Sequence, residues 1–322
     1  MARNANPSAW PRAWGYAKPV SGPNKSARDH AILIGLPRKP SHIMASKDTN
    51  TIAIATPRQA ATVMLLRDSN DSGDGMEVFM IVRHQSNDFA SGALVFPGGR
   101  VDPEDHDIAA DASVFPPQAG MDADRAALRV AAIRETFEEC GVLLARARGD
   151  TALVSAARLL EIDAAHRPAL ARGERTFGAM LVAEKLVLAV DAMVHFAHWI
   201  TPVHVPKRFD THFFLAAAPS DQVALHDGNE AVDSIWITPQ CAIEDTQTGT
   251  YKLVFPTQMN LQKLARHTPS AAALDAARAS RVVTVVPVQE RAGNGVRVMR
   301  LPLEAGYGGE LFEVTNPSSF PS

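Results

Sequence analysis

An acidic helix preceded by a glycine-rich loop is the feature that most constrains this chain. The run from Arg134 to Val142 reads Arg-Glu-Thr-Phe-Glu-Glu-Cys-Gly-Val, and it follows the loop Phe96 to Arg100, which reads Phe-Pro-Gly-Gly-Arg. Residues three and four apart share one face of an α-helix, so Glu135, Glu138 and Glu139 project from the same turn. The pattern therefore predicts a tight loop followed by a helix with three clustered carboxylates.

The three carboxylates repel one another. Like charges at this spacing cost about 0.2–0.5 kcal/mol per pair on an isolated helix, and Arg134 offsets only part of this cost through Glu138. A bound cation would remove the conflict, and carboxylate oxygens suit Mg²⁺ or Mn²⁺, which also bind phosphate oxygens. Gly141 stands where a helix commonly ends, and the preceding loop can bring backbone carbonyls, including that of Gly98, close to an ion. The alternative is a solvated charged helix face, the usual role of such clusters.

These residues resemble the Nudix box, G-x5-E-x7-R-E-U-x-E-E-x-G-U, in which U is a bulky apolar residue. Gly99 matches its first glycine, and Arg134 to Val142 match its second half, except that Thr136 replaces an apolar residue. Asp105 stands at the position of the first glutamate. Residues 106–133 place 28 residues where the ordinary box has seven, so 21 are inserted. We expect this insertion to loop out between the glycine loop and the helix.

The aspartate at position 105 and the 21-residue insertion both resemble features of one branch of the family. The stretch from Gly98 to Asp105 is similar to the box of the coenzyme A diphosphatases, and a lengthened box resembles the peroxisomal type of mammals and its bacterial relatives. The segment from Trp199 to Leu215 also resembles that branch. One position differs, because the branch usually carries an arginine four residues before Gly92, where this chain has Asp88. Arg83 remains at the end of the preceding strand, where it can line the nucleotide pocket.

The resemblance implies an α/β fold, a Nudix-like α/β/α sandwich with a mixed sheet, here with a helical insertion. In the family, the three glutamates of the helix bind Mg²⁺ or Mn²⁺ against a diphosphate, and the arginine beside them orients a glutamate. Glu135, Glu138, Glu139 and Arg134 match these positions. Asp105 is a shorter acid than the family's glutamate, so a structural role at the base of the loop stands beside a metal role.

Three further residues are candidates for the site. Glu230 lies just before an expected strand, where many family members place another acidic ligand or base. Alternatives for this role stand nearby at Asp227 and Asp233. Lys207 and Arg208 can meet substrate phosphates, although a solvated basic pair explains them equally well. The eleven histidines show no H-E-x-x-H or other paired spacing, so surface or packing roles are expected for them.

The combined pattern predicts a divalent-metal-dependent hydrolase that cleaves the diphosphate bond of a nucleoside diphosphate-linked small molecule. The resemblance to the coenzyme A diphosphatases implies coenzyme A or an acyl-coenzyme A as the leading substrate, which would give 3′,5′-ADP and (acyl-)4′-phosphopantetheine. Catalysis would require charge neutralisation, an aligned water and a base, either Glu135 or Glu230. Two alternatives remain: hydrolysis of ADP-ribose or a dinucleoside polyphosphate, which Asp88 favours, and a Nudix-like ligand-binding module without turnover.

Composition excludes several other classes of protein. The 322 residues are 46% hydrophobic, enough for a substantial core, and the formal net charge of −3 provides no basic field for nucleic acid. Cys140 and Cys241 lack the spacing of a zinc site or a disulfide scaffold, which favours a reducing compartment. The apolar stretch 177–200 contains three charged residues, so no membrane span is expected. Without a secretory or peroxisomal signal, a cytoplasmic protein is expected, and its oligomeric state does not follow from the sequence.

Periodicity divides the chain into three parts. Residues 1–48 are rich in proline, glycine and serine without periodicity, which predicts a flexible N-terminal extension. Residues 49–268 are expected to form the Nudix hydrolase domain, with the box insertion at about 106–126 and added helices at about 151–193. Residues 269–322 are expected to form a C-terminal extension with a hairpin.

Individual elements follow from the same periodicities. Strands are predicted over 60–67, 77–83, 94–96, 142–145, 197–200, 211–216 and 234–237. Helices are predicted over 122–139, 151–164, 174–193 and 256–267. The C-terminal hairpin is expected from 281–288 and 295–301.

Overall fold

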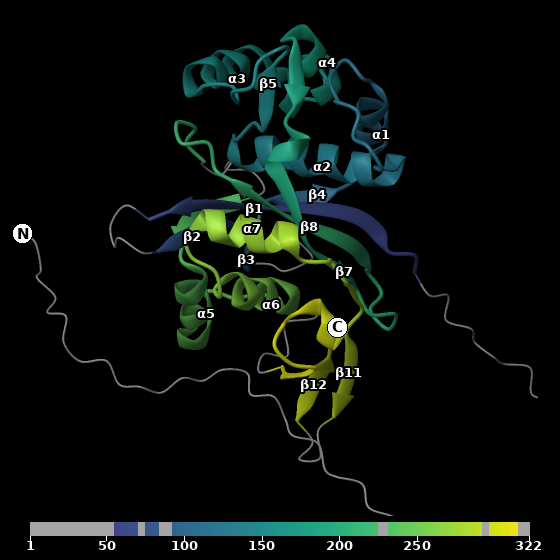
Figure 1. Cartoon of the computed structure of the whole chain (residues 1–322), viewed down its shortest axis with the longest axis vertical. Helices are drawn as coiled ribbons and strands as arrows, with labels where there is room; N and C mark the ends of the chain where they lie inside the picture. The colour runs from purple at the N-terminus through teal and green to yellow at the C-terminus, as the bar shows by residue number, and fades with distance from the viewer. Residues whose placement is uncertain (1–54, 70–74, 84–91, 225–230, 292–295, 315–322) are drawn as a thin grey trace, which may run out of the picture.

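A mixed sheet of eight strands runs through the part of the chain that the structure, a computed structural model, describes: residues 55–69, 75–83, 92–224, 231–291 and 296–314. Its strands run in the order β10-β7-β8-β1-β2-β3, while β4 pairs with β1 and β9 with β2 (Figure 1). β1 is parallel to β8 and antiparallel to β2 and β4. The strands are β1 Arg58–Asp68, β2 Met76–Arg83, β3 Leu94–Val95, β4 Gly98–Arg100, β7 Met193–Ile200, β8 Phe209–Ala217, β9 Ala231–Ile237 and β10 Thr284–Val285.

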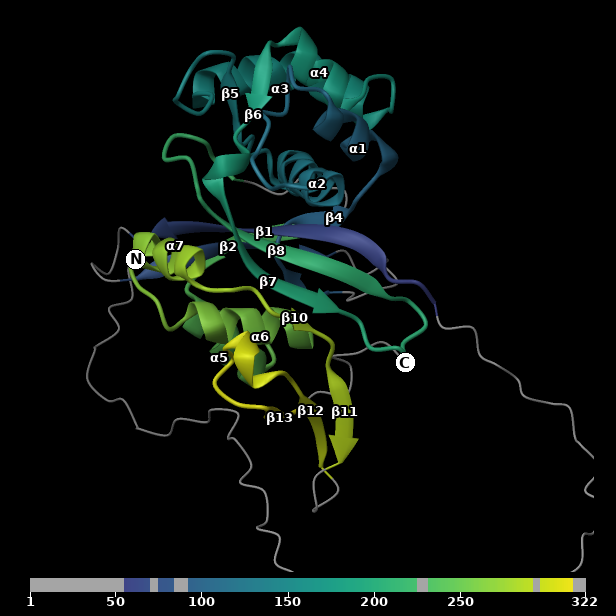
Figure 2. The ribbon, with the colours of Figure 1, turned by 45° about the vertical axis from the view of Figure 1, so that its right-hand side comes forward.

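Helices cover both faces of this sheet, as the two views in Figures 1 and 2 show. α2 lies on one face with α1, α3 and α4 beyond it, while α5, α6 and α7 cover the other. Side chains of β1 alternate between two buried clusters: Val63 and Leu65 face α2, and Met64 and Leu66 face the opposite helices. The predicted α/β/α sandwich with a mixed sheet is therefore confirmed. The helices are α1 Pro103–Ala110, α2 Ala123–Cys140, α3 Ala156–Ala171, α4 Phe177–Ala183, α5 Pro239–Thr248, α6 Phe255–Leu264 and α7 Ser270–Ala279.

Capping residues set both ends of α2, the helix that carries the acidic run. Asp122 accepts a hydrogen bond from the backbone N–H of Arg125 at 2.8 Å. Gly141 adopts the left-handed conformation with φ of 68°, and its N–H donates to the carbonyl of Phe137 at 3.0 Å. Ile133 and Phe137 are buried in the cluster beneath the helix. This packing determines the rotation of α2 and so the direction of its glutamates.

The insertion between the glycine loop and α2 begins as a helix. α1 starts with Pro103 at its first position, and the carboxylate of Asp105 accepts a hydrogen bond from the backbone N–H of Asp102 at 2.8 Å. Three apolar residues of the insertion are buried in the same cluster as α2: Ile108, Val114 and Phe115. The prediction that the insertion loops out was therefore wrong, because its apolar side chains pack into the core.

The added segment at 151–193 contains strand as well as helix. Thr176 caps α4, which ends at Ala183, and Lys185 then adopts a positive φ of 54°. Residues Leu186–Leu188 form β6, which pairs antiparallel with β5 (Ala145–Ala147). A short 3₁₀ helix, η1 (Val190–Ala192), leads into β7. The second half of the predicted helix over 174–193 was wrong, because the pairing of β6 with β5 buries its leucines, and this pairing is a tertiary contact.

Residues beyond 268 contribute to the main sheet and form a second, smaller one. α7 lies against the main sheet, and β10 extends that sheet parallel to β7. β11 (Val288–Arg291) and β12 (Arg297–Arg300) form an antiparallel pair, to which β13 (Leu311–Glu313) adds after the 3₁₀ helix η2 (Leu303–Ala305). The first strand of the predicted hairpin, 281–288, is thus divided between two sheets. The main sheet and the helices that cover it thus continue beyond residue 268.

A buried hydrogen-bonded chain joins this C-terminal part to the core. The indole Nε1–H of Trp199 donates to the hydroxyl of Tyr307 at 2.8 Å, and that hydroxyl donates to Oδ1 of Asn260 at 2.8 Å. The hydroxyl therefore satisfies two buried polar groups at once.

We expect Tyr307→Phe to lower the free energy of unfolding by about 1–3 kcal/mol, because Trp199 and Asn260 would each lose a buried partner. Urea unfolding followed by tryptophan fluorescence measures this. Tyr251→Phe is the control, since the Tyr251 hydroxyl has no hydrogen-bond partner within the described residues, and it should change stability by no more than about 0.5 kcal/mol. Equal unfolding free energies for Tyr307→Phe and the wild type would contradict the prediction.

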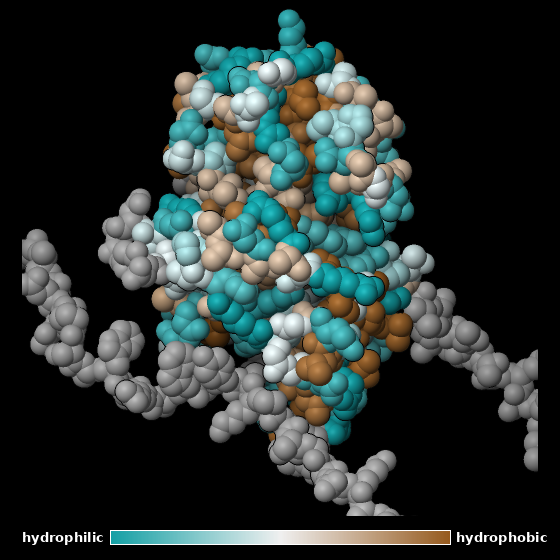
Figure 3. Space-filling model, viewed as in Figure 1, coloured by the Kyte–Doolittle hydropathy of each residue, from teal (hydrophilic) through white to brown (hydrophobic). Residues whose placement is uncertain are grey.

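The molecular surface in Figure 3 is mostly hydrophilic. Hydrophobic side chains gather at its lower right, where β7 and β11 lie in Figure 1. Val286 and Val288, at the start of the small sheet, are among the exposed large hydrophobic residues. Within the described residues, no helix combines the length and the apolar character that crossing a bilayer requires.

Candidate active site

The guanidinium of Arg134 joins the acidic helix to the loop of the box. Its Nε and Nη2 donate to the two carboxylate oxygens of Asp105 at 2.9 and 3.0 Å, which makes a bidentate pair. Its Nη1 donates to Glu135 at 2.9 Å and to Glu138 at 3.1 Å. Nη2 also donates to the carbonyl of Arg100 at 3.0 Å. One side chain therefore positions two glutamates of α2 and anchors the loop beside them.

Asp105 is fully buried and belongs to the framework of the site. Its Oδ1 accepts from Nε of Arg134, and its Oδ2 accepts from Nη2 of Arg134 and from the backbone of Asp102. Both carboxylate oxygens are thus used by the protein. These contacts favour the structural role at the base of the loop over the metal role.

The two glycines of the loop allow it to lie against the carboxylates. The N–H of Gly98 donates to Oε2 of Glu139 at 2.7 Å. A Cβ at Gly98 would lie 2.3 Å from the carbonyl oxygen of Ala61, and one at Gly99 would lie 2.3 Å from Oε1 of Glu135. A side chain at Gly98 would force the loop away from the backbone of β1, and one at Gly99 would displace the carboxylate of Glu135. The structure therefore brings Glu135, Glu139 and the glycine loop together.

Negative charge exceeds positive charge around this part of α2. Burial raises the pKa of Glu138; Arg134 opposes the rise, while the charges of Asp105 and Glu104 add to it. Burial alone would lower the pKa of Arg134, but Asp105 and Glu135 hold it well above its usual range. The Glu138 side chain is 43% exposed, so the cluster is open to solvent. A hard divalent cation fits such a set, because all the donors are oxygens and its charge offsets the excess.

The predicted basic residues lie in different surroundings. Arg83 ends β2, and its Nε is shielded from solvent without a hydrogen-bond partner in the described part of the chain. Lys207 is exposed in the connection between β7 and β8. Arg208 is buried and donates to the carbonyls of Thr201 at 3.0 Å and Ala55 at 2.8 Å. These contacts correct the substrate role predicted for Arg208, because its guanidinium ties the connection to the chain that enters β1.

Two of the acidic candidates, Glu230 and Asp227, lie outside the described residues. So does Asp88, which stands at the position of the branch's arginine. Asp233 is exposed in β9, where its carboxylate accepts from the backbone of Ser234 at 2.8 Å. The role of Glu230 as a ligand or base stays a prediction.

An open cavity of about 450 Å³ lies beside the loop of the box. Its lining includes the side chains of Arg58, Arg100 and His106, which can carry positive charge, and one acid, Asp102. One of the lining residues, Arg100, accepts a hydrogen bond from Arg134 at its carbonyl, which connects the cavity to the loop of the box. A phosphorylated group fits the electrostatics of this cavity.

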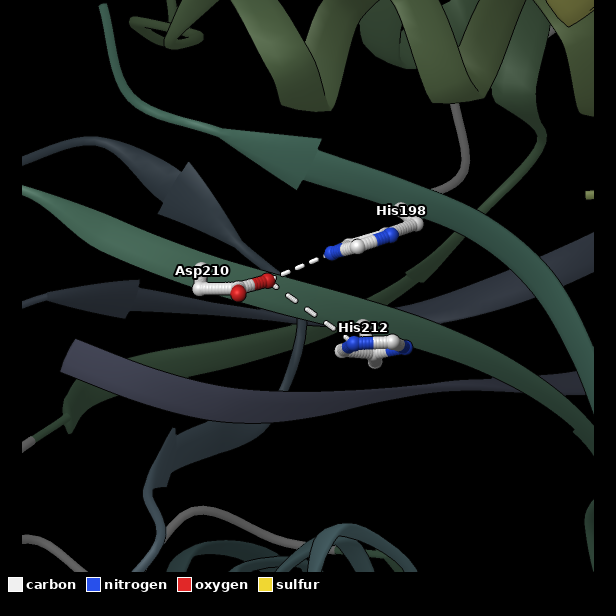
Figure 4. Close-up of side chains that lie close together, drawn as sticks. All are labelled: His198, Asp210 and His212. Atoms are coloured by element: carbon white, nitrogen blue, oxygen red, sulfur yellow. Dashed lines mark hydrogen bonds and ion pairs between the residues drawn. The ribbon is translucent and has the colours of Figure 1, made fainter. Parts of the chain in front are cut away.

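Two histidines and an aspartate that the sequence analysis missed meet on neighbouring strands (Figure 4). Asp210 and His212 stand two apart on β8, and His198 stands opposite His212 on β7. Burial, with neighbouring positive charge, lowers the pKa of His212 to about 4, so this ring is neutral at neutral pH. Hydrogen bonding to His198 lowers the pKa of Asp210. Alternation along β8 was the only sequence signal for this group, because the third residue comes from another strand.

Comparison with known proteins gives consistent results. A model of the NUDT19 Nudix domain matches residues 118–264. The acyl-coenzyme A diphosphatase NUDT19 of Xenopus laevis is 25% identical over 241 residues, which cover 62% of each chain. A putative Nudix hydrolase 7 of Caenorhabditis elegans is 25% identical over 189 residues, which cover 59% of this chain and 56% of that protein. The chain thus spans about 60% of the length of the curated relatives it matches.

A solved structure also matches the fold. The crystal structure of a Nudix hydrolase from Alicyclobacillus acidocaldarius is 28% identical, with a TM-score of 0.59, and the match covers 69% of this chain and 97% of that one. The domain match, the related sequences and this structure agree with the box residues that Arg134 organises on α2. Residues 118–264 thus match a Nudix domain, and the chain is similar to Nudix hydrolases in sequence and in fold.

Proposed function

We propose that this protein is a divalent-metal-dependent diphosphatase that hydrolyses coenzyme A or an acyl-coenzyme A. The products are 3′,5′-ADP and (acyl-)4′-phosphopantetheine. One observation carries the reaction type: Arg134 and the glycine loop hold three glutamates of α2 around a solvent-open cluster with excess negative charge. An arrangement of this kind suits a cation and the phosphate oxygens that the cation binds.

Glu135, Glu138 and Glu139 are the residues that would hold Mg²⁺ or Mn²⁺, with the carbonyl of Gly98 as a further ligand. The ion, when bound, offsets phosphate charge and acidifies a bound water. Arg134 restricts Glu135 and Glu138 to one arrangement, so little reorganisation is needed when substrate binds. Glu135 or Glu230 accepts the proton of the attacking water. Arg134 itself is a positioning residue, since its donors are already used by carboxylates and a carbonyl.

Two observations support a coenzyme A substrate. The relative from Xenopus laevis bears the name of an acyl-coenzyme A diphosphatase. The cavity beside the box presents Arg58, Arg100 and His106, which can recognise a phosphate in addition to the scissile diphosphate. Arg83, whose Nε lacks a partner in the described part of the chain, and the exposed Lys207 are further candidates for phosphate contacts.

Turnover of a substrate panel tests the proposal. The purified chain is incubated with Mg²⁺ or Mn²⁺ and with coenzyme A, an acyl-coenzyme A, ADP-ribose and a diadenosine polyphosphate, and kcat/KM is measured for each. The proposal expects the highest value for coenzyme A or its acyl form. A higher value for ADP-ribose or the dinucleotide would favour the alternative that Asp88 suggests. No turnover of any compound, with binding retained, would indicate a Nudix-like binding module.

Removing the 3′-phosphate of the substrate is expected to weaken catalysis. Dephospho-coenzyme A lacks about two negative charges, and the loss of one charge-assisted hydrogen bond costs about 1.5–3 kcal/mol, or roughly 10- to 150-fold in kcat/KM. The penalty should shrink in Arg58→Ala or Arg100→Ala if these side chains make the contact, and in Lys207→Ala if that residue does. Arg278→Ala, on the exposed face of α7, is the control and should leave the ratio unchanged. Equal kcat/KM for coenzyme A and dephospho-coenzyme A in the wild type would show that no basic side chain recognises the 3′-phosphate.

A further inference from the structure

We propose that His198, Asp210 and His212 form a second metal site, selective for a transition-metal ion such as Zn²⁺ and separate from the carboxylates of α2. Nε2 of His198 lies 2.5 Å from Oδ1 of Asp210, and Nε2 of His212 lies 3.8 Å from the same oxygen. Figure 4 shows the three side chains converging from β7 and β8. Ligand atoms around tetrahedral Zn²⁺ are separated by about 3.3 Å, a spacing that these two distances bracket.

Strand register and one irregularity bring these side chains to one face of the sheet. His198 pairs with His212, and Asp210 follows on the same face two residues away. The register shifts between His195 and Ala197, so His195 also projects to this face and stacks on His212 with ring centroids 4.9 Å apart. The geometry of the group is thus set by backbone pairing and does not depend on a flexible loop.

The other ring nitrogen, Nδ1, of both His198 and His212 also has a hydrogen-bond partner. Nδ1 of His198 lies 2.8 Å from the hydroxyl of Thr284, and Nδ1 of His212 lies 3.0 Å from Nε2 of His195. Metal-binding histidines almost always engage their other nitrogen in this way, which fixes ring orientation and tautomer. When His212 donates its Nδ1–H to His195, its Nε2 carries a lone pair toward Asp210. The Thr284 hydroxyl can donate or accept, so His198 can present a lone pair at Nε2 as well.

Ligand chemistry separates this group from the carboxylate cluster. Two imidazole nitrogens and one carboxylate suit Zn²⁺ and similar ions, whereas Mg²⁺ prefers oxygen ligands. The side chains of His198 and His212 are each 16% exposed and that of Asp210 is 27% exposed, so an ion can enter and retain a water. Ala61 of β1 pairs with His212 of β8 on one side and with Gly99 of β4 on the other. His212 and Gly99 are therefore two strand spacings apart, or about 10 Å. One ion cannot serve both sites.

Calorimetric titration of the full chain with Zn²⁺ in excess Mg²⁺ tests the proposal without reference to activity. The wild type is expected to bind one Zn²⁺ per chain under these conditions, and His204→Gln, which changes an exposed histidine outside the group, should behave alike. Thr284→Val should weaken Zn²⁺ binding by roughly 10- to 100-fold, the usual cost of losing an outer partner. The double variant His198→Gln/His212→Gln and the isosteric Asp210→Asn should each lose at least about 100-fold, because a ligand itself is removed.

The outcomes of the titration are distinct. Thermal unfolding without Zn²⁺ shows whether each variant is folded. If the double histidine variant does not fold, Asp210→Asn still tests the site, because it keeps the shape of the side chain. Zn²⁺ affinity equal to that of the wild type in Asp210→Asn would overturn the proposal. So would loss of Zn²⁺ binding in Glu138→Gln/Glu139→Gln, since the ion would then occupy the carboxylate cluster. Absence of Zn²⁺ binding in the wild type would leave the group as a hydrogen-bonded network of the sheet.

Discussion

Replacement of Glu138 or Glu139 by glutamine is expected to lower kcat at least about 100-fold while the protein stays folded. Each substitution removes one negative charge from a set of donors that hold a cation against phosphate, and this interaction is strongest in the transition state. Both substitutions keep the shape of the side chain, so the fold should be retained. At position 139 the amide oxygen of glutamine can still accept from the N–H of Gly98, and at position 138 the side chain is 43% exposed. Steady-state kinetics at saturating Mg²⁺ measure the loss.

The matched control for these variants is Glu161→Gln in α3. Its carboxylate is 67% exposed and pairs only with Arg158, at 2.8 Å, among the contacts that the structure records for it. Exposed pairs of this kind contribute about 0–1 kcal/mol, so both kcat and the melting temperature should stay close to those of the wild type. Near-normal kcat in Glu138→Gln or Glu139→Gln, with Mg²⁺ saturating, would show that the metal ligands have been assigned incorrectly.

Asp105→Ala is expected to lower the free energy of unfolding by about 3–5 kcal/mol, the usual cost of removing one partner from a buried ion pair. Arg134 would keep its charge at a site that is only 6% exposed and would lose its bidentate partner. The backbone N–H of Asp102 would lose its acceptor as well. Because Arg134 also positions Glu135 and Glu138, kcat should fall together with stability. Urea unfolding and steady-state kinetics measure the two effects.

Asp107→Ala provides the comparison for this second prediction. Asp107 lies two residues along the same helix, α1, but is exposed, and such substitutions usually change stability by no more than about 0.5 kcal/mol. Asp105→Asn should fall between the wild type and Asp105→Ala, since it keeps the shape of the side chain but loses its charge. If Asp105→Ala unfolds at the same urea concentration as Asp107→Ala, the buried pair with Arg134 does not hold the loop to the helix.

The acidic helix and the glycine loop were predictable because their requirements are local. The spacing of Glu135, Glu138 and Glu139 decides that they share one helical turn, whatever surrounds the helix. Gly141 ends α2 because only a residue tolerant of positive φ caps it well. The close approach of Gly99 to Glu135 also depends on residue type, since a Cβ at position 99 would displace the Glu135 carboxylate. Such features depend on residues that are close in sequence or on the absence of a side chain.

Elements that depend on distant partners were not predictable in the same way. Leu186 to Leu188 continue an apolar run that favours helix, but they form β6 because β5 offers a pairing edge. The box insertion continues α1 and packs beside α2 because Ile108 and Phe115 are buried in the core. Arg208 resembled a phosphate-binding residue, yet its guanidinium binds the carbonyls of Thr201 and Ala55, which are brought to it by the fold.

By itself, the sequence determined the acidic helix, the loop before it and their resemblance to the Nudix box, because helical period and glycine conformation act over a few residues. Only the tertiary structure decided that Asp105 is buried against Arg134, and that His198, Asp210 and His212 meet. These contacts join segments 29 and 12 residues apart, and they depend on the packing of α1 against α2 and on the register of β7 with β8. The irregularity between His195 and Ala197 decides which histidines share a face, and no local pattern specifies it.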